Sequence, residues 1–342
     1  MFDYFINFFL ILFVTFFINA LAKKIKRLDN FSGQLHQILT KKKEIPLSGG
    51  LILIILIIVK FNLIENNLLY FLFFIFLVGF LADLRILKSP LIRFTLQIIF
   101  TLLFIFILNL SISEIKISWF DSLLTNRYFN IFFVLFCFLV LVNGSNFIDG
   151  NNALAIGYFC LIIFTILNLN DEVNLDKQYE TLLIFIFISL LILLIFNIFN
   201  KLYLGDGGIY LLSALVGFIL IKLYSNNQNI SPFFIANLLW YPSFEILFSL
   251  IRKIKRKYSP MDPDTQHLHQ LIFRKYLIYF KNNFIFSNNL TGITINIYHL
   301  IIFYVSYLNY SKSIFQMYII ILNIIVYLFV YYLLKKDLSF KK

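Results

Sequence analysis

The chain has 342 residues, of which 61% are hydrophobic and 13% charged, and its formal net charge is +12. Soluble domains contain about 45–50% apolar and about 25% charged residues, so a single water-facing globule is excluded and lipid must surround much of the surface. The two cysteines, Cys137 and Cys160, both lie inside apolar runs and predict neither a disulfide nor a zinc site.

Apolar runs close to the roughly 20 residues that cross a bilayer recur along the whole chain. They predict an all-α polytopic membrane protein with one transmembrane domain over 1–342 and about eleven transmembrane helices. The first run is expected to be a span and not a cleavable leader, because its positive charge follows it. The predicted spans are 4–22, 46–64, 68–82, 94–110, 129–142, 153–169, 181–196, 208–224, 232–251, 290–308 and 314–334.

The basic residues predict the orientation of these spans. Placing the run 23–27 in the cytoplasm puts the amino terminus outside and the carboxyl terminus in the cytoplasm. The predicted cytoplasmic segments then contain 23 of the 29 lysines and arginines, as the positive-inside rule requires. Topology and attraction to anionic lipid account for the net charge, so no nucleic-acid partner is expected.

Three aspartates, Asp83, Asp149 and Asp206, stand where apolar runs stop, and this topology places all three on the cytoplasmic side. An ionised carboxylate at membrane depth costs several kcal/mol unless water, a cation or a partner compensates it. The three acids therefore predict a cation site, and a cation beside a membrane usually indicates phosphate chemistry. Asp206 lies between glycines at the start of a span, a setting that suits Mg²⁺ bridging a diphosphate. A turn with an aspartate helix cap is the alternative.

Polar residues near these acids extend the candidate site. Asn143, Asn146 and Asp149 are spaced three residues apart, so they lie on one face if the helix continues through them. Side chains placed in this way are expected to bind a uracil or ribose, or to hold metal-bound water. A capped polar helix end is the alternative. Arg93 and Gln97 lie one turn apart and are expected to flank the same site, although the Asp83 segment also reads as an ordinary loop beside the membrane.

The largest predicted cytoplasmic loop contains His267 and His269, which share a face only in an extended segment. Contact with an anion is expected there, since no further ligand at zinc spacing is present; a solvated basic loop is the alternative. Glu245, inside a predicted span, needs a partner, and Arg252 follows two turns later. His299 is expected to be a satisfied polar group of its span.

Five motifs in register resemble the polyprenyl-phosphate N-acetylhexosamine-1-phosphate transferase superfamily, on its initiating-transferase branch, and they spread over most of the chain. They are His36…Pro46-Leu47-Ser48-Gly49-Gly50, Gly79-Phe80-Leu81-Ala82-Asp83…Gln97, Asn143-x-x-Asn146-x-x-Asp149-Gly150, Leu204-Gly205-Asp206-x-Gly208, and Pro242-x-x-Glu245…Arg252…Ser259-Pro260-x-x-Pro263-Asp264-x-x-His267-Leu268-His269.

Several positions depart from the family pattern. Ala82 replaces the first aspartate of the usual pair, which is proposed to deprotonate the lipid phosphate. Asn152 and Ala153 replace an Asp-Gly, and Glu245 stands for an aspartate. Thr265 and Gln270 replace an arginine and a final histidine. The missing base has a small physical cost, because a phosphate monoester with a second pKa near about 6 is mostly dianionic at pH 7.

The resemblance implies transfer of a sugar-1-phosphate, expected to be N-acetylhexosamine-1-phosphate, from a UDP-sugar to polyprenyl (undecaprenyl) phosphate, with release of UMP at the start of cell-envelope glycan assembly. It implies a bacterial inner membrane location, a cytoplasmic active site, and Mg²⁺ with Mn²⁺ as an alternative. The partners are the lipid, the UDP-sugar and the membrane, with a homodimer left open. The implied catalytic residues are Asp83, Asp149 and Asp206, the last two as metal ligands, and the implied substrate contacts are His36, Asn143, Asn146, Gly150, Arg252, His267 and His269.

Two other functions stay open at this point. A transporter or lipid-carrier flippase predicts acids near the bilayer midplane and inverted repeats, and the sequence shows no repeat. A catalytically silent protein of the same fold is the other, because of Ala82.

Overall fold

The computed structural model describes residues 2–25, 28, 45–169, 173, 175–257, 259 and 266–339, and every regular element among them is helical. His36 and the 260–265 segment lie outside the described residues. The elements are α1 (Phe2–Ala22), α2 (Gly49–Val59), a 3₁₀ turn η3 (Phe61–Leu63), α3 (Asn66–Asp83), α4 (Pro90–Ile107), α5 (Ser118–Leu124), α6 (Arg127–Ile148), α7 (Leu154–Leu169), α8 (Lys177–Ile198), α9 (Gly205–Asn226), α10 (Pro232–Leu238), α11 (Trp240–Lys255), α12 (Leu268–Tyr279), α13 (Phe284–Tyr307) and α14 (Ser313–Ser339).

Each of the eleven predicted spans coincides with helix, but the helices differ in their capacity to cross a membrane. In the described part of the chain, eight are long and apolar enough to do so by themselves. Two more, α2 and α7, are apolar but shorter, and α10 and α11 together form a bent pair. The chain is therefore a polytopic helical protein, whereas the number of eleven spans stays a prediction.

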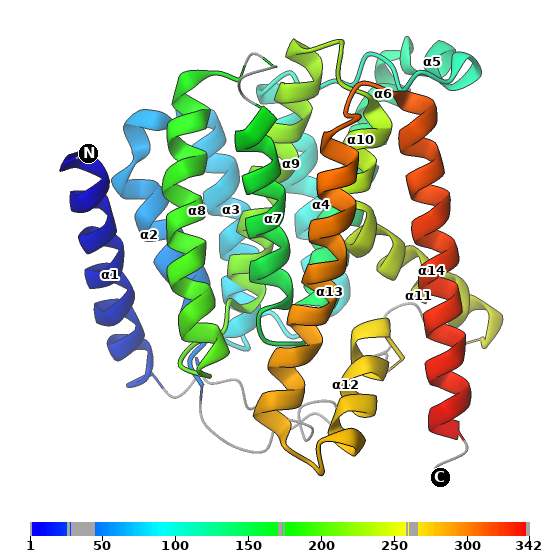
Figure 1. Ribbon diagram of the computed structural model, residues 1–342. Helices are drawn as coiled ribbons and strands as arrows, with labels where there is room; N and C mark the ends of the chain where they lie inside the picture. Colours follow the sequence, from blue (N-terminus) through cyan, green and yellow to red (C-terminus); the bar gives the residue numbers. More distant parts are fainter. Residues whose placement is uncertain are drawn as a thin grey trace.

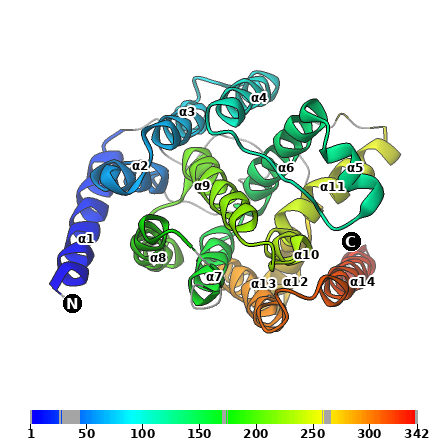
Figure 2. The same ribbon diagram turned by 90° about the horizontal axis from the view of Figure 1, so that it is seen from above.

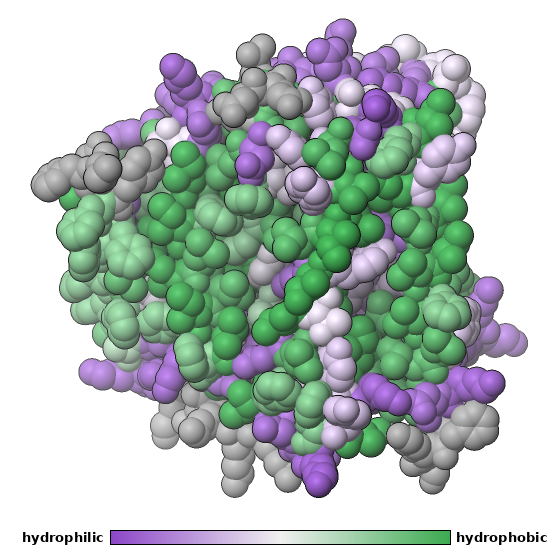
Figure 3. Space-filling model, in the orientation of Figure 1, coloured by the Kyte–Doolittle hydropathy of each residue, from purple (hydrophilic) through white to green (hydrophobic). Residues whose placement is uncertain are grey.

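The outer helices present large apolar side chains to their surroundings. Phe13 of α1 is 67% exposed, Phe132 of α6 62% and Ile314 of α14 70%. Hydrophobic residues cover the middle of the face in Figure 3, and hydrophilic residues gather above and below this band. Lipid is the solvent that such a band needs, because water would make the same exposure unfavourable.

Helix α9 forms the centre of the bundle and is the most deeply buried candidate span, with 89% of an apolar stretch of 18 residues buried inside the structure. Seen from above, the other helices surround it (Figure 2). Glycines permit the closest of these contacts: a Cβ atom on Gly50 of α2 would lie 2.4 Å from the backbone nitrogen of Gly208. A Cβ atom on Gly79 of α3 would lie 2.5 Å from the carbonyl carbon and oxygen of Asp206. The amino-terminal turn of α9 is thus packed backbone to backbone against two neighbouring helices.

The span predicted over 232–251 is broken, because α10 and α11 meet at 75° around Leu239. Pro242 lies in the first turn of α11 and has no N–H with which to continue the helix of α10. The hydroxyl of Tyr158 occupies the break: it donates to the carbonyl oxygen of Leu238 at 2.9 Å and accepts from the N–H of Tyr241 at 3.3 Å. A partner of this kind is what a helix break at membrane depth requires.

The two termini lie at opposite ends of the bundle (Figure 1). The short helix α5 lies at the end where α6 begins, and α12 lies at the other end. Which end faces the cytoplasm stays a prediction from the charges.

Candidate active site

Asp83 and the start of α9 form the most tightly built part of the site. Asp83 is the last residue of α3 and is 8% exposed. Its Oδ1 accepts a hydrogen bond from the N–H of Asp206 at 2.9 Å, and its Oδ2 accepts one from the N–H of Gly207 at 3.0 Å. Asp83 therefore caps the amino terminus of α9 from a different helix, satisfying N–H groups that α9 leaves without an intrahelical partner.

Glycine is required where α9 begins. Gly205 has a φ of +76°, and a Cβ atom there would lie 2.7 Å from Oδ2 of Asp83. A larger residue would meet both a strained backbone and the capping carboxylate. The cap therefore explains why glycine precedes Asp206. Gly205 lets the backbone of this turn approach Asp83 at the end of α3.

The side chain of Asp206 points to α4. Its Oδ2 accepts a hydrogen bond from Nη1 of Arg93 at 2.8 Å, and the two side chains are 27% and 23% exposed. The sequence predicted that Arg93 flanks the site, and this ion pair places it there. Because both groups remain partly exposed, the pair can still accept a ligand at its open side.

Asp149 follows the last residue of α6 and is half-buried. Burial raises the pKa of Asp149 well above its ordinary value, and the nearby charge of Asp206 raises it further. The charges of Asp83 and Asp149 also interact. The three predicted acids therefore lie at one end of the bundle, close enough for their charges to repel one another.

The polar stripe on α6 extends from these acids. Nδ2 of Asn143 donates to Oε1 of Gln97 on α4 at 2.9 Å and to the carbonyl oxygen of Leu139 at 2.9 Å. Asn146 is half-buried and makes no side-chain hydrogen bond with the described residues. The amide of Asn146 is thus available to a ligand, whereas that of Asn143 is fixed between α4 and α6.

The two histidines come to the same region from α12. His267 precedes α12 in an extended conformation, and its ring is nearly parallel to that of His269, with centroids 5.5 Å apart. A Cβ atom on Gly150 would lie 3.1 Å from Nε2 of His269, so the histidines adjoin the end of α6. Gly150 therefore links the acidic and the histidine parts of the site.

Glu245 positions His267. This fully buried carboxylate lies 2.8 Å from Nδ1 of His267 through Oε1 and accepts from the hydroxyl of Tyr327 at 2.9 Å through Oε2. Sequence reasoning required a partner for Glu245 but did not identify one. The family motif that contains both residues is the signal from which this pair could have been found.

Arg252 lies further out, on the α14 side of α11. Its Nη1 donates to the hydroxyl of Tyr331 at 3.3 Å, and its guanidinium lies over the rings of Phe248 and Tyr331. These contacts do not bring it to the three acids, so its predicted substrate contact stays a prediction.

Sequence reasoning missed a set of asparagines around the loop after Asp149. The amide of Asn152 donates to the Oδ1 atoms of Asn200 and Asn289, both at 2.8 Å. The N–H of Ala153 donates to Oδ1 of Asn197 at 2.7 Å. Asn152, which departs from the family pattern, is thus part of a network that joins the loop to α8 and α13.

The fit of the site to Mg²⁺ follows from its donors. Among the described residues, no three His, Cys, Asp or Glu side chains form a ready-made metal cluster. Asp206 and Asp149 provide hard carboxylate oxygens, and Asp206 is partly exposed. Magnesium is commonly held by one or two carboxylates together with waters and substrate phosphates. The residues present fit that mode of binding.

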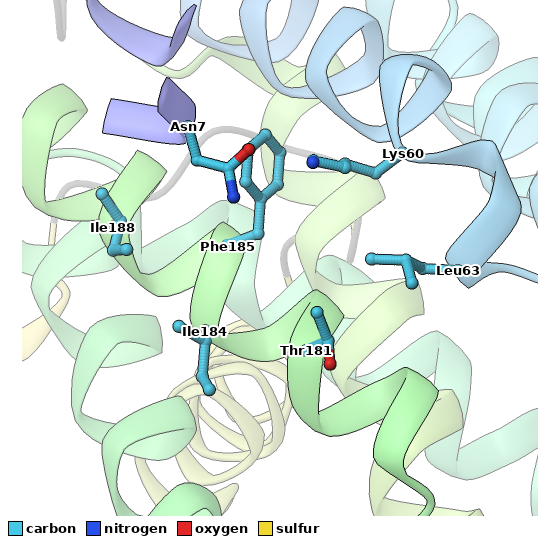
Figure 4. Close-up of a pocket in the computed structure, with 7 residues that line it drawn as sticks. All are labelled: Asn7, Lys60, Leu63, Thr181, Ile184, Phe185 and Ile188. Atoms are coloured by element: carbon cyan, nitrogen blue, oxygen red, sulfur yellow. The ribbon is translucent and has the colours of Figure 1, made fainter. Parts of the chain in front are cut away.

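Two cavities lie away from these acids. One, of about 30 Å³, lies between α1, α8 and the segment after α2. Asn7, Lys60 and Phe185 are among the residues that line it (Figure 4). It has room for water only, and the ammonium group of Lys60 lies 5.1 Å from the centre of the Phe185 ring. The other, of about 340 Å³, is formed by the far ends of α4 and α6 with α5. Neither is the acidic site.

Comparison with known proteins agrees with the motifs. The model of glycosyl transferase family 4 matches residues 66–224, which run from α3 to α9. The chain is 26% identical over 273 residues to an undecaprenyl-phosphate alpha-N-acetylglucosaminyl 1-phosphate transferase of Thermotoga maritima, covering 77% of this chain and 78% of that protein. It is 27% identical over 279 residues to the protein of the same name from Escherichia coli O157:H7, covering 76% and 72%. With the motifs in register along the same stretch, the chain is similar to glycosyl transferase family 4 over residues 66–224 and to these transferases over about three quarters of its length.

Proposed function

We propose that this protein transfers a sugar-1-phosphate from a UDP-N-acetylhexosamine to undecaprenyl phosphate or a similar polyprenyl phosphate, releasing UMP. The observation that carries the proposal is the Arg93–Asp206 ion pair of 2.8 Å, at a helix start that Asp83 caps. The arrangement provides a cation, a carboxylate and a helix amino terminus at one point. The two relatives compared above are named as transferases of this kind.

The reaction exchanges one phosphoanhydride for another. An oxygen of the lipid phosphate attacks the β-phosphorus of the UDP-sugar, and the bond from that phosphorus to the oxygen bridging the two phosphates breaks. The bridging oxygen leaves with UMP, and the sugar stays bonded to the β-phosphate. Transfers of this type need positioning and charge neutralisation more than covalent help.

Each part of the site contributes to these needs. Arg93 neutralises diphosphate charge while it keeps Asp206 oriented. His267, positioned by Glu245, and His269 contact the diphosphate or sugar, and Asn146 binds the nucleotide. Asp83 keeps the backbone of the α9 turn in place with both of its oxygens, and Ala82 beside it has no carboxylate to offer the lipid phosphate. That phosphate needs none at neutral pH, because it is already mostly dianionic.

Mg²⁺ is the cofactor that we propose, held by Asp206 and Asp149. When bound, it supplies positive charge against the developing charge on the phosphate oxygens. It also relieves the repulsion between the carboxylates. The positions of the two acids, at the end of α6 and at the start of α9, determine where the positive charge of the metal would lie.

The membrane supplies the acceptor. We place the protein in the bacterial inner membrane with the acids at the cytoplasmic face, on the grounds of the charge distribution and the apolar band. The polyprenyl tail then lies among the outer helices and its phosphate reaches the acids from the lipid side.

The proposal is tested by incubating purified protein with Mg²⁺, undecaprenyl phosphate and a panel of UDP-sugars, and measuring UMP. We expect UMP release that requires both the lipid and an N-acetylated sugar nucleotide. Release without lipid would indicate hydrolysis, and none with any sugar would favour a transporter or a catalytically silent protein. A Glu180→Gln variant, which changes an acid of α8 outside the site, is the matched control for loss of a carboxylate.

A further inference from the structure

The end of the bundle opposite the acids has a cavity of its own. It measures about 340 Å³, within the range of ligand pockets. Its walls are partly apolar and partly polar, and they come from the end of α4, from α5 and from the start of α6. The lining residues used below are Ile105, Phe106, Asn109, Ser111, Arg127 and Ile131.

Helix α6 separates this cavity from the acidic site. It begins at Arg127 and ends just before Asp149. Its 22 residues correspond to about 33 Å at 1.5 Å per residue, which is close to the hydrocarbon thickness of a bilayer. The cavity therefore lies at the other membrane–water interface.

Aromatic side chains mark that interface. Trp119 of α5 is 68% exposed and Tyr128 of α6 is 82% exposed, on either side of the α5–α6 turn. Trp and Tyr concentrate at the level of lipid headgroups, where a ring with one polar end is partly solvated. Helix α5 is seen at this end of the bundle in Figure 1.

Arg127 has no intramolecular partner among the described residues, unlike most cations on this side. Lys116 donates to the carbonyl oxygens of Gln228 and Ile230, and Lys312 donates to Oδ1 of Asn309. Arg127 instead is one of the residues that line the cavity. Asn109 and Ser111 line it too, and their side chains form no hydrogen bond with the described part of the chain.

We propose that this cavity binds the headgroup phosphate of an anionic diacyl phospholipid, on the membrane face opposite Asp206. A guanidinium binds phosphate oxygens with two parallel hydrogen bonds, and the amide and hydroxyl of Asn109 and Ser111 add donors. Ile105, Phe106 and Ile131 continue the wall with apolar surface, as an acyl chain requires. A soluble anion would gain nothing from that surface, which is why a lipid is the occupant.

Native mass spectrometry of the detergent-purified full chain tests this proposal, with phosphatidylglycerol, phosphatidylethanolamine and inorganic phosphate as probes. We expect phosphatidylglycerol to bind more tightly than phosphatidylethanolamine. Arg127→Gln should weaken phosphatidylglycerol binding by at least about tenfold, since it removes charged hydrogen bonds. Ser111→Trp, which fills the cavity and keeps the arginine, should weaken it similarly.

Lys177→Gln is the matched control, because Lys177 is an exposed cation on the same predicted side at the start of α8. It should bind lipid as the unaltered protein does. Equal loss in Lys177→Gln would show general electrostatic attraction, and unchanged binding in either cavity variant would overturn the site. Displacement of the lipid by millimolar inorganic phosphate would contradict a lipid occupant. Since Arg127 lies far from the acids, UMP release should persist in Arg127→Gln, so this test is independent of the proposed activity.

Discussion

The carboxylate of Asp83 binds the backbone N–H of Asp206 at 2.9 Å, so one acid of the site positions the other through its main chain. The two residues are 123 positions apart in sequence. The second oxygen of Asp83 accepts from the next N–H, that of Gly207. Both oxygens are therefore occupied by α9, and Asp206 remains the acid whose side chain faces Arg93 and the substrate side.

The capping role of Asp83 predicts different outcomes for two substitutions. Asparagine keeps one acceptor oxygen but turns an NH2 group towards the second N–H, so Asp83→Asn should lose part of the cap, and Asp83→Ala, which keeps neither acceptor, should lose more, about 1 to 2 kcal/mol. Thermal unfolding in detergent, without metal, measures both. Equal stability of the alanine variant and the unaltered protein would show that the cap contributes nothing.

The contact between α3 and α9 predicts that Gly79 tolerates no side chain. A Cβ atom there would lie 2.5 Å from the backbone of Asp206, so Gly79→Ala must push the two helices apart and move the cap. We expect a cost of about 1 to 3 kcal/mol and a large loss of UMP release. Gly217→Ala is the control within α9, because its Cβ would meet only side-chain atoms, of Phe138 at 3.0 Å and of Leu141 at 3.2 Å, and no backbone. Similar behaviour of the two variants would argue against the backbone contact.

The environment of Asp149 predicts a pH dependence of stability. Its pKa is raised in the folded protein by burial and by Asp206, so its ionised form is disfavoured on folding. The metal-free protein should therefore lose stability as the pH rises from about 4 to the raised pKa of Asp149, and this group should cause no further loss above it. Asp149→Asn should unfold at a higher temperature than the unaltered protein at pH 8, and Mg²⁺ should stabilise it less. An unchanged pH profile in Asp149→Asn would assign the dependence to another group.

The loop after Asp149 predicts a stabilising substitution. Ala153 has a φ of +63°, in the left-handed region where glycine is at no disadvantage, and the family pattern has glycine at this position. Ala153→Gly should stabilise the protein by about 0.5 to 1 kcal/mol, as relief of this strain exceeds the larger entropy of the unfolded glycine. Unfolding temperature and UMP release measure it, with activity expected to stay unchanged. Destabilisation would mean that the Ala153 methyl group packs favourably.

Much of this architecture could be predicted from the sequence. Long apolar runs indicated the helices. The distribution of lysines and arginines indicated that Asp83, Asp149 and Asp206 lie at one end of the bundle. Both could be predicted because the length of a run and the charge beside it are local properties of the sequence. The break between α10 and α11 could not be predicted that way: the run is continuous, and the hydroxyl that stabilises the break comes from Tyr158 on another helix.

The roles of single side chains were harder to predict. The motif showed that Asp83 belongs to the site, but its pairing with the N–H groups of α9 depends on a contact that only the fold creates. Likewise, the Glu245–His267 contact joins residues on α11 and at the start of α12. His36 lies outside the described residues, and Arg252 points to α14, so their predicted roles stay predictions.

Transfer of the β-phosphate itself tests the central claim most directly. UDP-N-acetylglucosamine labelled with ³²P at the β-phosphate is incubated with undecaprenyl phosphate, Mg²⁺ and purified protein, and the label is followed into the organic phase. We predict that the label enters the lipid with one UMP released per labelled lipid, and that Asp206→Asn, folded normally, reduces the rate at least about a hundredfold. Label that remains in UDP while the sugar alone reaches the lipid, or a near-normal rate in Asp206→Asn, would contradict the account.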